Sequence, residues 1–256
     1  MDEAKVEQDP GGPQRVVCLH GLGMPAAVMA PMAMALRRAG FAPDVVAYPS
    51  CRAPLPDLAE TYLRPALCGP GPVHVVGHSL GGLLVRALAL RGLPDALGRV
   101  VMCGTPNHGS DVVDLLARSR LFRAAFGPTG AALGTGPDQW PAGLPALDGI
   151  DVGVIAGTLP ISPFARTMNG PNDGIVSVSS TRLDGADHVS VRANHSGMLL
   201  SSTVFGHVVK FLETGAFAHV VDGAAQMNLI KNDQWTGVSS SPVAPSSGRG
   251  ERCGGV

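Results

Sequence analysis

The chain has 256 residues, of which 45% are hydrophobic and 15% are charged, and its formal net charge is −1. This length suits one domain with a sizeable core, whereas a charge near zero and an aromatic content of 4% argue against binding to nucleic acid or to an anionic membrane. No run reaches the roughly 18 apolar residues that span a bilayer, so we expect no transmembrane segment.

The chain opens with a polar segment, residues 1–13, which we expect to be a disordered lead-in. A secretory signal begins with a basic patch and an apolar run, whereas this segment is rich in acidic residues. We therefore expect a cytoplasmic protein rather than a secreted one. An apolar run over 15–20 predicts a buried strand, and Gly21-Leu22-Gly23 predicts the loop that follows it. Further elements are predicted over 31–39 (helix), 45–48 (strand) and 55–67 (helix).

Residues 77–81, Gly77-His78-Ser79-Leu80-Gly81, fit the pattern G-x-S-x-G. An apolar run over 73–76 precedes the pattern, and a helix-forming run over 83–90 follows it. Strand, sharp turn and helix are typical of a nucleophile elbow, in which a strained turn exposes a serine hydroxyl at the carboxyl edge of a sheet. A Cβ at either flanking glycine is expected to collide with the neighbouring strand or helix. A glycine-rich turn with an incidental serine is the alternative.

The rest of the chain continues the alternation of strands and helices. Several strands are apolar on both faces, which predicts a three-layer α/β/α sandwich with a mostly parallel central sheet. An insertion over 107–148 is a candidate cap or lid. The domain is predicted to span 14–221, and 222–256 reads as a polar, low-complexity tail. The remaining elements are predicted over 99–103, 150–155 and 187–191 (strands) and 196–211 (helix).

An activated serine needs an imidazole to take its proton and a carboxylate to orient that imidazole. In a sheet of this winding the acid follows the serine along the chain, and the histidine comes last. Asp173 is the candidate acid, because it follows a core strand and Gly174 permits a tight turn after it. Asp151, Asp184 and Asp187 are the rivals, but they lie at the wrong end of a strand or in a turn before one.

His195 is the candidate base, because it follows the last predicted strand. His188 begins that strand, His207 lies inside the last helix and His219 lies beyond it. The reaction also needs donors for a developing oxyanion, and the backbone N–H groups of Leu80 and Leu22 occupy the expected positions. His20 reads as a buried hydrogen-bonding support rather than an acid or base.

The motifs together resemble the α/β-hydrolase superfamily, and within it bacterial lipase- and esterase-type members, over roughly residues 14–215. This resemblance implies a serine hydrolase with Ser79, Asp173 and His195 as its triad, and it places the loop after the fourth strand beside the active site. The motifs that carry it are His20-Gly21-Leu22-Gly23, Gly77-His78-Ser79-Leu80-Gly81-Gly82, Gly104-Thr105-Pro106-Asn107-His108-Gly109-Ser110, Asn172-Asp173-Gly174-Ile175-Val176 and His195-Ser196-Gly197.

Met24, Asn107 and His108 are candidates for substrate contact, and structural roles are the alternative for Asn107 and His108. Apolar residues near Met24 and in 111–147 are expected to line an acyl pocket, so we expect a carboxylic ester or lipid as the partner molecule. Transient contact with a lipid surface stays open. No cofactor is required, and no calcium site is inferred, because Ser196 follows His195 where calcium-dependent secreted lipases continue toward a metal-binding aspartate.

Two alternatives remain on the same fold. One is a thioesterase or acyltransferase, which would need a site for a coenzyme or carrier, and the sequence has no basic cluster for a phosphorylated carrier. The other is a catalytically silent protein that binds or regulates. The five cysteines include no C-x-x-C pair, and the sequence leaves open whether Cys51 and Cys68 form a disulfide.

Overall fold

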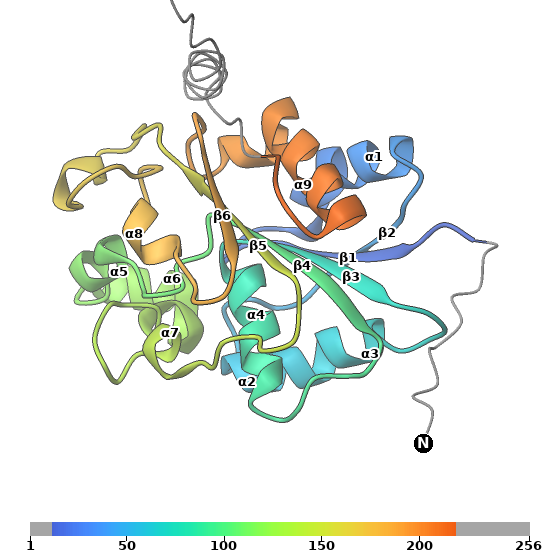
Figure 1. Ribbon diagram of the computed structural model, residues 1–256. Coiled ribbons are helices and arrows are strands. Elements are labelled where there is room, and N and C mark those ends of the chain that lie inside the picture. The colour runs from blue at the N-terminus through green and yellow to red at the C-terminus, as the bar shows by residue number, and fades with distance from the viewer. Residues whose placement is uncertain (1–11, 219–256) are drawn as a thin grey trace, which may run out of the picture. The chain divides into compact units, whose positions relative to one another are not determined.

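The computed structural model describes residues 12–218; residues 1–11 of the predicted lead-in and the whole predicted tail, 222–256, lie outside the described residues. Its centre is a six-stranded sheet with the strand order β2-β1-β3-β4-β5-β6 (Figure 1). Every neighbouring pair is parallel, which confirms the predicted fold class. The strands are β1 (Arg15–Leu19), β2 (Ala42–Val46), β3 (Val73–His78), β4 (Leu97–Cys103), β5 (Val152–Gly157) and β6 (Asp187–Val191).

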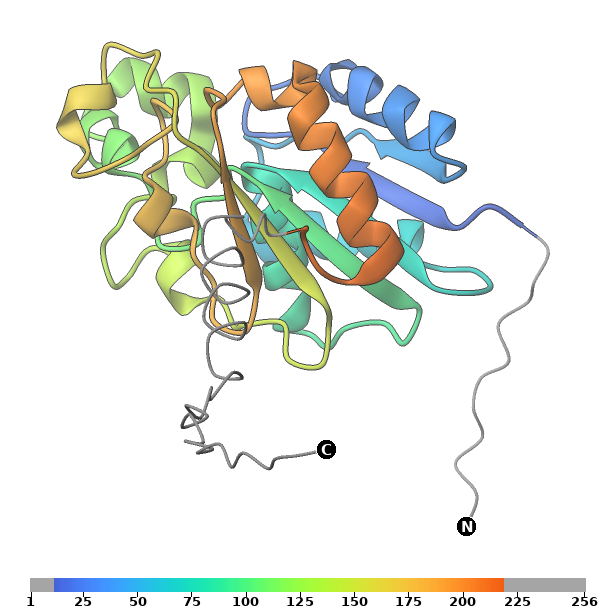
Figure 2. The ribbon, with the colours of Figure 1, turned by 45° about the horizontal axis from the view of Figure 1, so that its top comes forward.

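Helices cover both faces of the sheet (Figures 1 and 2). One face carries α1 (Ala30–Arg38) and α9 (Ser202–Thr214). The other carries α4 (Leu80–Ala89) and the helical segment 55–66, which consists of α2 (Leu55–Leu58), a π-helical turn (Ala59–Leu63) and α3 (Arg64–Ala66).

The alternation of side chains along a strand sorts the core into two layers. In β1, Val17 and Leu19 pack in the layer that contains the leucines of α2 and α4, whereas Val16 and Cys18 pack in the layer of α1 and α9. All four side chains are fully buried. Burial on both faces explains why the strands are apolar throughout instead of alternating with polar residues.

Among the predicted elements whose bounds shift in the structure, two have a clear physical reason. The strand predicted over 45–48 begins at Ala42 and includes Pro43, which is tolerated because β2 lies at the edge of the sheet. The helix predicted over 196–211 is divided into a 3₁₀ turn (Gly197–Leu200) and α9. The division lies at Ser201, whose hydroxyl accepts a hydrogen bond from the N–H of Val204 at 3.4 Å and caps α9.

The segment between β4 and β5 contains α5 (Asp111–Leu116), α6 (Arg120–Ala131) and α7 (Trp140–Gly143). These helices gather at one end of the sheet together with α8 (Val178–Thr181) (Figure 1). Along the chain, α8 and a 3₁₀ turn (Ala165–Thr167) come after β5 and before β6. Within the described residues, no helix is long and apolar enough to cross a membrane. Cys51 and Cys68 are both free thiols.

Candidate active site

Ser79 occupies a strained turn between β3 and α4. It has φ 52° and ψ −117°, and it is the only residue other than glycine with a positive φ within residues 12–218. A Cβ at Gly77 would lie 2.5 Å from the backbone nitrogen of Gly82, and one at Gly81 would lie 2.6 Å from the carbonyl oxygen of Leu19. The tight approach of β1 and α4 to this turn therefore requires the two glycines, as the sequence pattern predicted.

Asp173 lies in the loop after β5, and its side chain is fully buried. One carboxylate oxygen, Oδ1, accepts hydrogen bonds from the backbone N–H groups of Ile175 (2.9 Å) and Val176 (2.8 Å). Gly174 makes this turn possible with a φ of 97°. The other oxygen, Oδ2, is therefore directed away from its own loop and lies 2.7 Å from Nδ1 of His195.

His195 follows β6 and is fixed to Asp173 at two points. Its backbone N–H donates to the carbonyl oxygen of Asp173 at 3.0 Å, and its ring nitrogen Nδ1 meets the carboxylate. Because a carboxylate only accepts, Nδ1 carries a hydrogen and Nε2 of a neutral ring has a free lone pair. The side chain of His195 is 11% exposed.

Ser79 and His195 line one cavity of about 350 Å³. The three residues that the sequence analysis selected from distant parts of the chain thus meet at one edge of the sheet. The site thus combines a strained serine, a largely buried imidazole and a buried carboxylate bonded to that imidazole, which are the residue types that activate a serine hydroxyl in other proteins.

The two expected oxyanion donors lie beside this serine. Leu22 lines the cavity, and Leu80 follows Ser79 as the first residue of α4, so its N–H has no acceptor within the helix. Across residues 12–218, neither N–H donates a hydrogen bond to another protein group. Both N–H groups therefore lack a protein acceptor among the described residues.

The loop of Leu22 is fixed by two residues that the sequence analysis did not identify, Tyr48 and Ser50. The Tyr48 hydroxyl donates to the carbonyl oxygen of His20, and the rings of these two residues stack at 4.2 Å between centroids. The Ser50 hydroxyl accepts a hydrogen bond from the N–H of Gly23 at 2.9 Å. Their only signal in the sequence is their position directly after β2, the strand that pairs with β1.

Apolar side chains form most of the cavity wall, and many of them come from the predicted cap. Met24, proposed from the sequence to contact substrate, is among the lining residues. The remaining apolar residues are Leu22, Pro106, Val112, Val113, Leu116, Phe122, Phe126, Leu133, Phe164, Ile175 and Val176.

Asn107 and His108, the other two candidates for substrate contact, do not line this cavity. Asn107 is buried. Its side-chain nitrogen donates to the carbonyl oxygen of Thr181 at 2.8 Å, and its backbone carbonyl oxygen accepts from the Arg86 guanidinium at 2.9 Å. Arg86 also donates to the carbonyl oxygens of Leu144 and Pro145 and so ties together the two ends of the insertion. His108 is exposed, and its backbone N–H donates to the carbonyl oxygen of Ser180 at 3.0 Å. The structure therefore gives both residues positions outside the cavity, with structural contacts.

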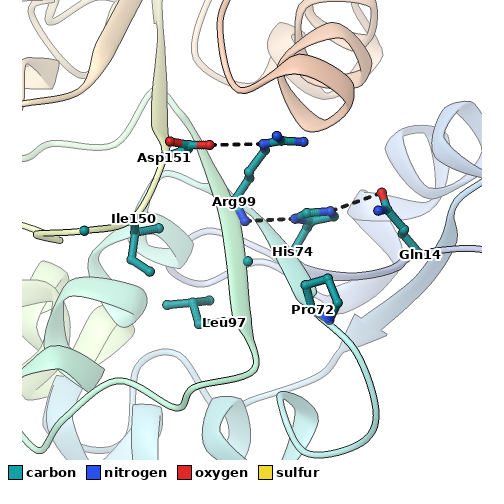
Figure 3. A pocket seen from close by; sticks show the side chains of 9 residues that line it. Gln14, Pro72, His74, Leu97, Arg99, Ile150 and Asp151 are labelled. Carbon is teal, nitrogen blue, oxygen red and sulfur yellow. Dashed lines mark hydrogen bonds and ion pairs between the residues drawn. The ribbon is translucent and has the colours of Figure 1, made fainter. Parts of the chain in front are cut away.

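A second cavity, of about 270 Å³, lies at the amino edge of the sheet (Figure 3). Its polar side chains bond one another. His74 accepts from the N–H of Arg99 at 2.8 Å and meets Oε1 of Gln14 at 3.3 Å, while the Arg99 guanidinium pairs with Asp151 at 3.2 Å. Asp151, a rival for the acid, therefore lies at the edge opposite Ser79. Among the described residues, no group of three or more His, Cys, Asp or Glu side chains could hold a metal ion.

Comparisons with known proteins agree with this architecture. Bacillus licheniformis lipase BlEst2 in its mature form has a TM-score of 0.60 and 24% identity, over 81% of this chain and 96% of that chain. The enol-lactonase from Burkholderia xenovorans has a TM-score of 0.55 and 18% identity, over 79% and 92%. The type II thioesterase BorB from the borrelidin biosynthetic cluster has a TM-score of 0.55 and 22% identity, over 80% and 93%.

These structures share the fold at low sequence identity, and no curated protein sequence matches the chain. A family model does match: residues 16–222, most of the chain, fit the family described as the alpha/beta hydrolase family. The chain therefore belongs to the alpha/beta hydrolase family.

Proposed function

We propose that the protein is a serine hydrolase that cleaves carboxylic esters through an acyl-enzyme on Ser79. The observation that carries the proposal is the convergence of a strained serine and a carboxylate-bonded imidazole on one apolar cavity. An oriented imidazole beside a serine is the arrangement that makes a weak hydroxyl nucleophile reactive.

In the proposed reaction, Nε2 of His195 takes the proton of Ser79 as the serine oxygen attacks the ester carbonyl. Asp173 stabilises the imidazolium that forms and keeps Nδ1 protonated. The N–H groups of Leu22 and Leu80 donate to the oxyanion of the tetrahedral intermediate, and each such donor is typically worth about 3 kcal/mol of barrier. His195 then gives its proton to the departing alcohol, and a water that it activates releases the acid from Ser79.

The apolar walls of the cavity favour an apolar acyl group as the part of the substrate that enters it. Its volume of about 350 Å³ is near the lower end of the range for small-molecule sites. None of the described residues that line it is arginine or lysine, so its walls offer no cation to a phosphorylated carrier. This observation favours a simple carboxylic ester over a carrier-bound thioester.

The test is hydrolysis of a series of p-nitrophenyl esters with increasing acyl length, with acyl thioesters measured in parallel. We expect turnover of the esters by the wild-type protein and a loss on the order of 10⁴-fold or more in kcat for Ser79→Ala, with folding checked by circular dichroism. Equal rates for wild type and Ser79→Ala would refute the proposal. A clear preference for thioesters would keep the nucleophile and replace the substrate class.

A further inference from the structure

His78 joins the turn of Ser79 to the loop of His195. It is the last residue of β3, directly before Ser79, and it is 1% exposed. Its Nε2 lies 2.9 Å from the backbone carbonyl oxygen of His195. Because a carbonyl oxygen only accepts, Nε2 carries the hydrogen and donates it. The bond spans 117 positions of sequence, and strands β4 and β5 separate β3 from β6 in the sheet.

The other hydrogen bonds of His195 do not reach this turn. Asp173 accepts both of them, one from the backbone N–H and one from the ring. The Asp173 carboxylate is itself held by Ile175 and Val176 of its own loop. These contacts fix the imidazole relative to the loop after β5. Among the described residues, the bond from His78 is the only hydrogen bond between His195 and the turn of Ser79.

We propose that His78 is a positioning residue that sets the separation between the Ser79 hydroxyl and the His195 imidazole. The inference rests on the proposed function, since it assigns His78 to the same reaction. A small change in that separation alters the geometry of proton transfer, and misplacement of about 1 Å can reduce a rate by on the order of a hundredfold.

The second ring nitrogen of His78 does not stabilise the folded protein. Nδ1 is buried and has no hydrogen-bond partner within the described residues. The loop of Leu22 covers it closely, because a Cβ at Gly21 would lie 3.1 Å from Nδ1. A buried polar atom without a partner destabilises the folded state. An apolar side chain would avoid this penalty, so the bond made by Nε2 is the polar contact that the ring contributes to the cavity wall.

The ring also stays uncharged beside the proposed base. Burial, and after it the nearby His195, lowers the pKa of His78 to about 3. The two ring centroids are 4.9 Å apart. When His195 takes a proton, a neutral neighbour adds no repulsion between like charges. His78 can therefore support the base without opposing the charge that the reaction creates.

Substitutions at position 78 separate the hydrogen bond from the space that the ring fills. His78→Leu removes the donor, and His78→Asn keeps a polar side chain that is too short to reach the carbonyl. His78→Gln places an amide N–H at a similar reach and serves as the conservative variant. His74→Leu is the matched control, because His74 is a buried histidine of the same strand whose bonds lie at the opposite edge of the sheet (Figure 3).

The rate at which a fluorophosphonate labels Ser79 measures activation of the serine without requiring knowledge of the ester substrate. We expect labelling to slow by about tenfold or more in His78→Leu and His78→Asn, to recover to within about threefold of wild type in His78→Gln, and to stay unchanged in His74→Leu. Melting temperatures of all variants identify any that fail to fold, and the shorter polar variant provides the comparison if the leucine variant does not fold.

The outcomes separate this inference from the proposed function. Equal labelling of wild type, His78→Leu and His78→Asn overturns the positioning role, even if esters are turned over. Labelling as slow in His78→Gln as in His78→Leu overturns it as well, because the effect would then come from the ring and not from its donor. Labelling that follows the expected order in a protein without ester turnover supports the inference and refutes only the substrate class. A wild-type protein that does not label at all contradicts both proposals.

Discussion

The two edges of the sheet each hold a buried histidine of β3 beside a cavity, but the two sites differ in how their polar groups are satisfied. At the amino edge, both ring nitrogens of His74 have partners, and Arg99 is paired with Asp151 (Figure 3). At the carboxyl edge, His78 has an unpartnered ring nitrogen among the described residues, and Ser79 is held in a strained conformation.

The N–H groups of Leu22 and Leu80 add to this difference, because neither donates a hydrogen bond within residues 12–218. Unsatisfied buried groups and backbone strain cost stability, and proteins concentrate them where they act on a ligand. The comparison teaches that a cavity alone does not identify a site. The polar side chains at the amino edge bond one another, whereas several polar groups at the carboxyl edge have no partner among the described residues.

The largest contrast is expected between the two aspartates. Asp173→Asn should lower kcat by on the order of 10³–10⁴-fold, because an amide no longer stabilises the imidazolium and can reverse the ring's tautomer. Asp151→Asn is the control at the amino edge. Its ion pair with Arg99 is partly exposed, so we expect unchanged activity and a loss of at most about 1 kcal/mol in unfolding free energy. Ester kinetics and urea unfolding of both variants measure the contrast, and similar activity losses would abolish it.

The positions of the residues at the carboxyl edge were largely predictable from the sequence. Ser79 was found because its motif stands between a strand and a helix, and Asp173 and His195 because chain order in a parallel sheet constrains where they fall. Asn107 could not be assigned in this way. Its contacts with Arg86 and Thr181 depend on how the insertion folds back, which no local pattern encodes.

The roles of Tyr48 and Ser50 were hidden for a related reason. Each stabilises the loop of Leu22 only because β2 and β1 pair in one particular register, in which Cys18 lies opposite Val45 and Leu19 opposite Val46. The bounds of β2 were also mispredicted at Pro43, because tolerance of proline depends on the strand's place at the edge of the sheet. Tertiary pairing, which sequence periodicity does not contain, decided all three.

A smaller effect concerns stability as a function of pH. Burial lowers the pKa of His74 from 6.5 to about 4, so between these values the unfolded chain binds more protons than the folded one. The free energy of unfolding therefore falls as the pH falls through this window. The wild-type protein should lose on the order of 3 kcal/mol of unfolding free energy between pH 6.5 and 4 through this group, and His74→Leu should not show that loss.

Urea unfolding at several pH values, with wild type and His74→Leu compared, measures this difference. Burial also lowers the pKa of His78, to about 3. His78→Leu should therefore also reduce the dependence of the unfolding free energy on pH. An unchanged slope in both variants would mean that neither ring is kept neutral by the fold.

The smallest expected effect is the relief of strain at Ser79. Glycine tolerates a φ of 52° without a steric penalty, so Ser79→Gly should be more stable than Ser79→Ala by about 1 kcal/mol. Ser190, an exposed residue of β6 without a positive φ, is the matched control, and there the alanine variant should be the more stable one. Thermal unfolding of the four variants gives both differences, and the same order at both positions would argue against strain.

The most direct test of the central claim is to locate a fluorophosphonate adduct by mass spectrometry of peptides from the wild-type protein. The account predicts one adduct per chain, on Ser79, and slower formation of that adduct in Asp173→Asn. An adduct on a different residue, or no adduct under conditions that label an active serine hydrolase, would contradict it.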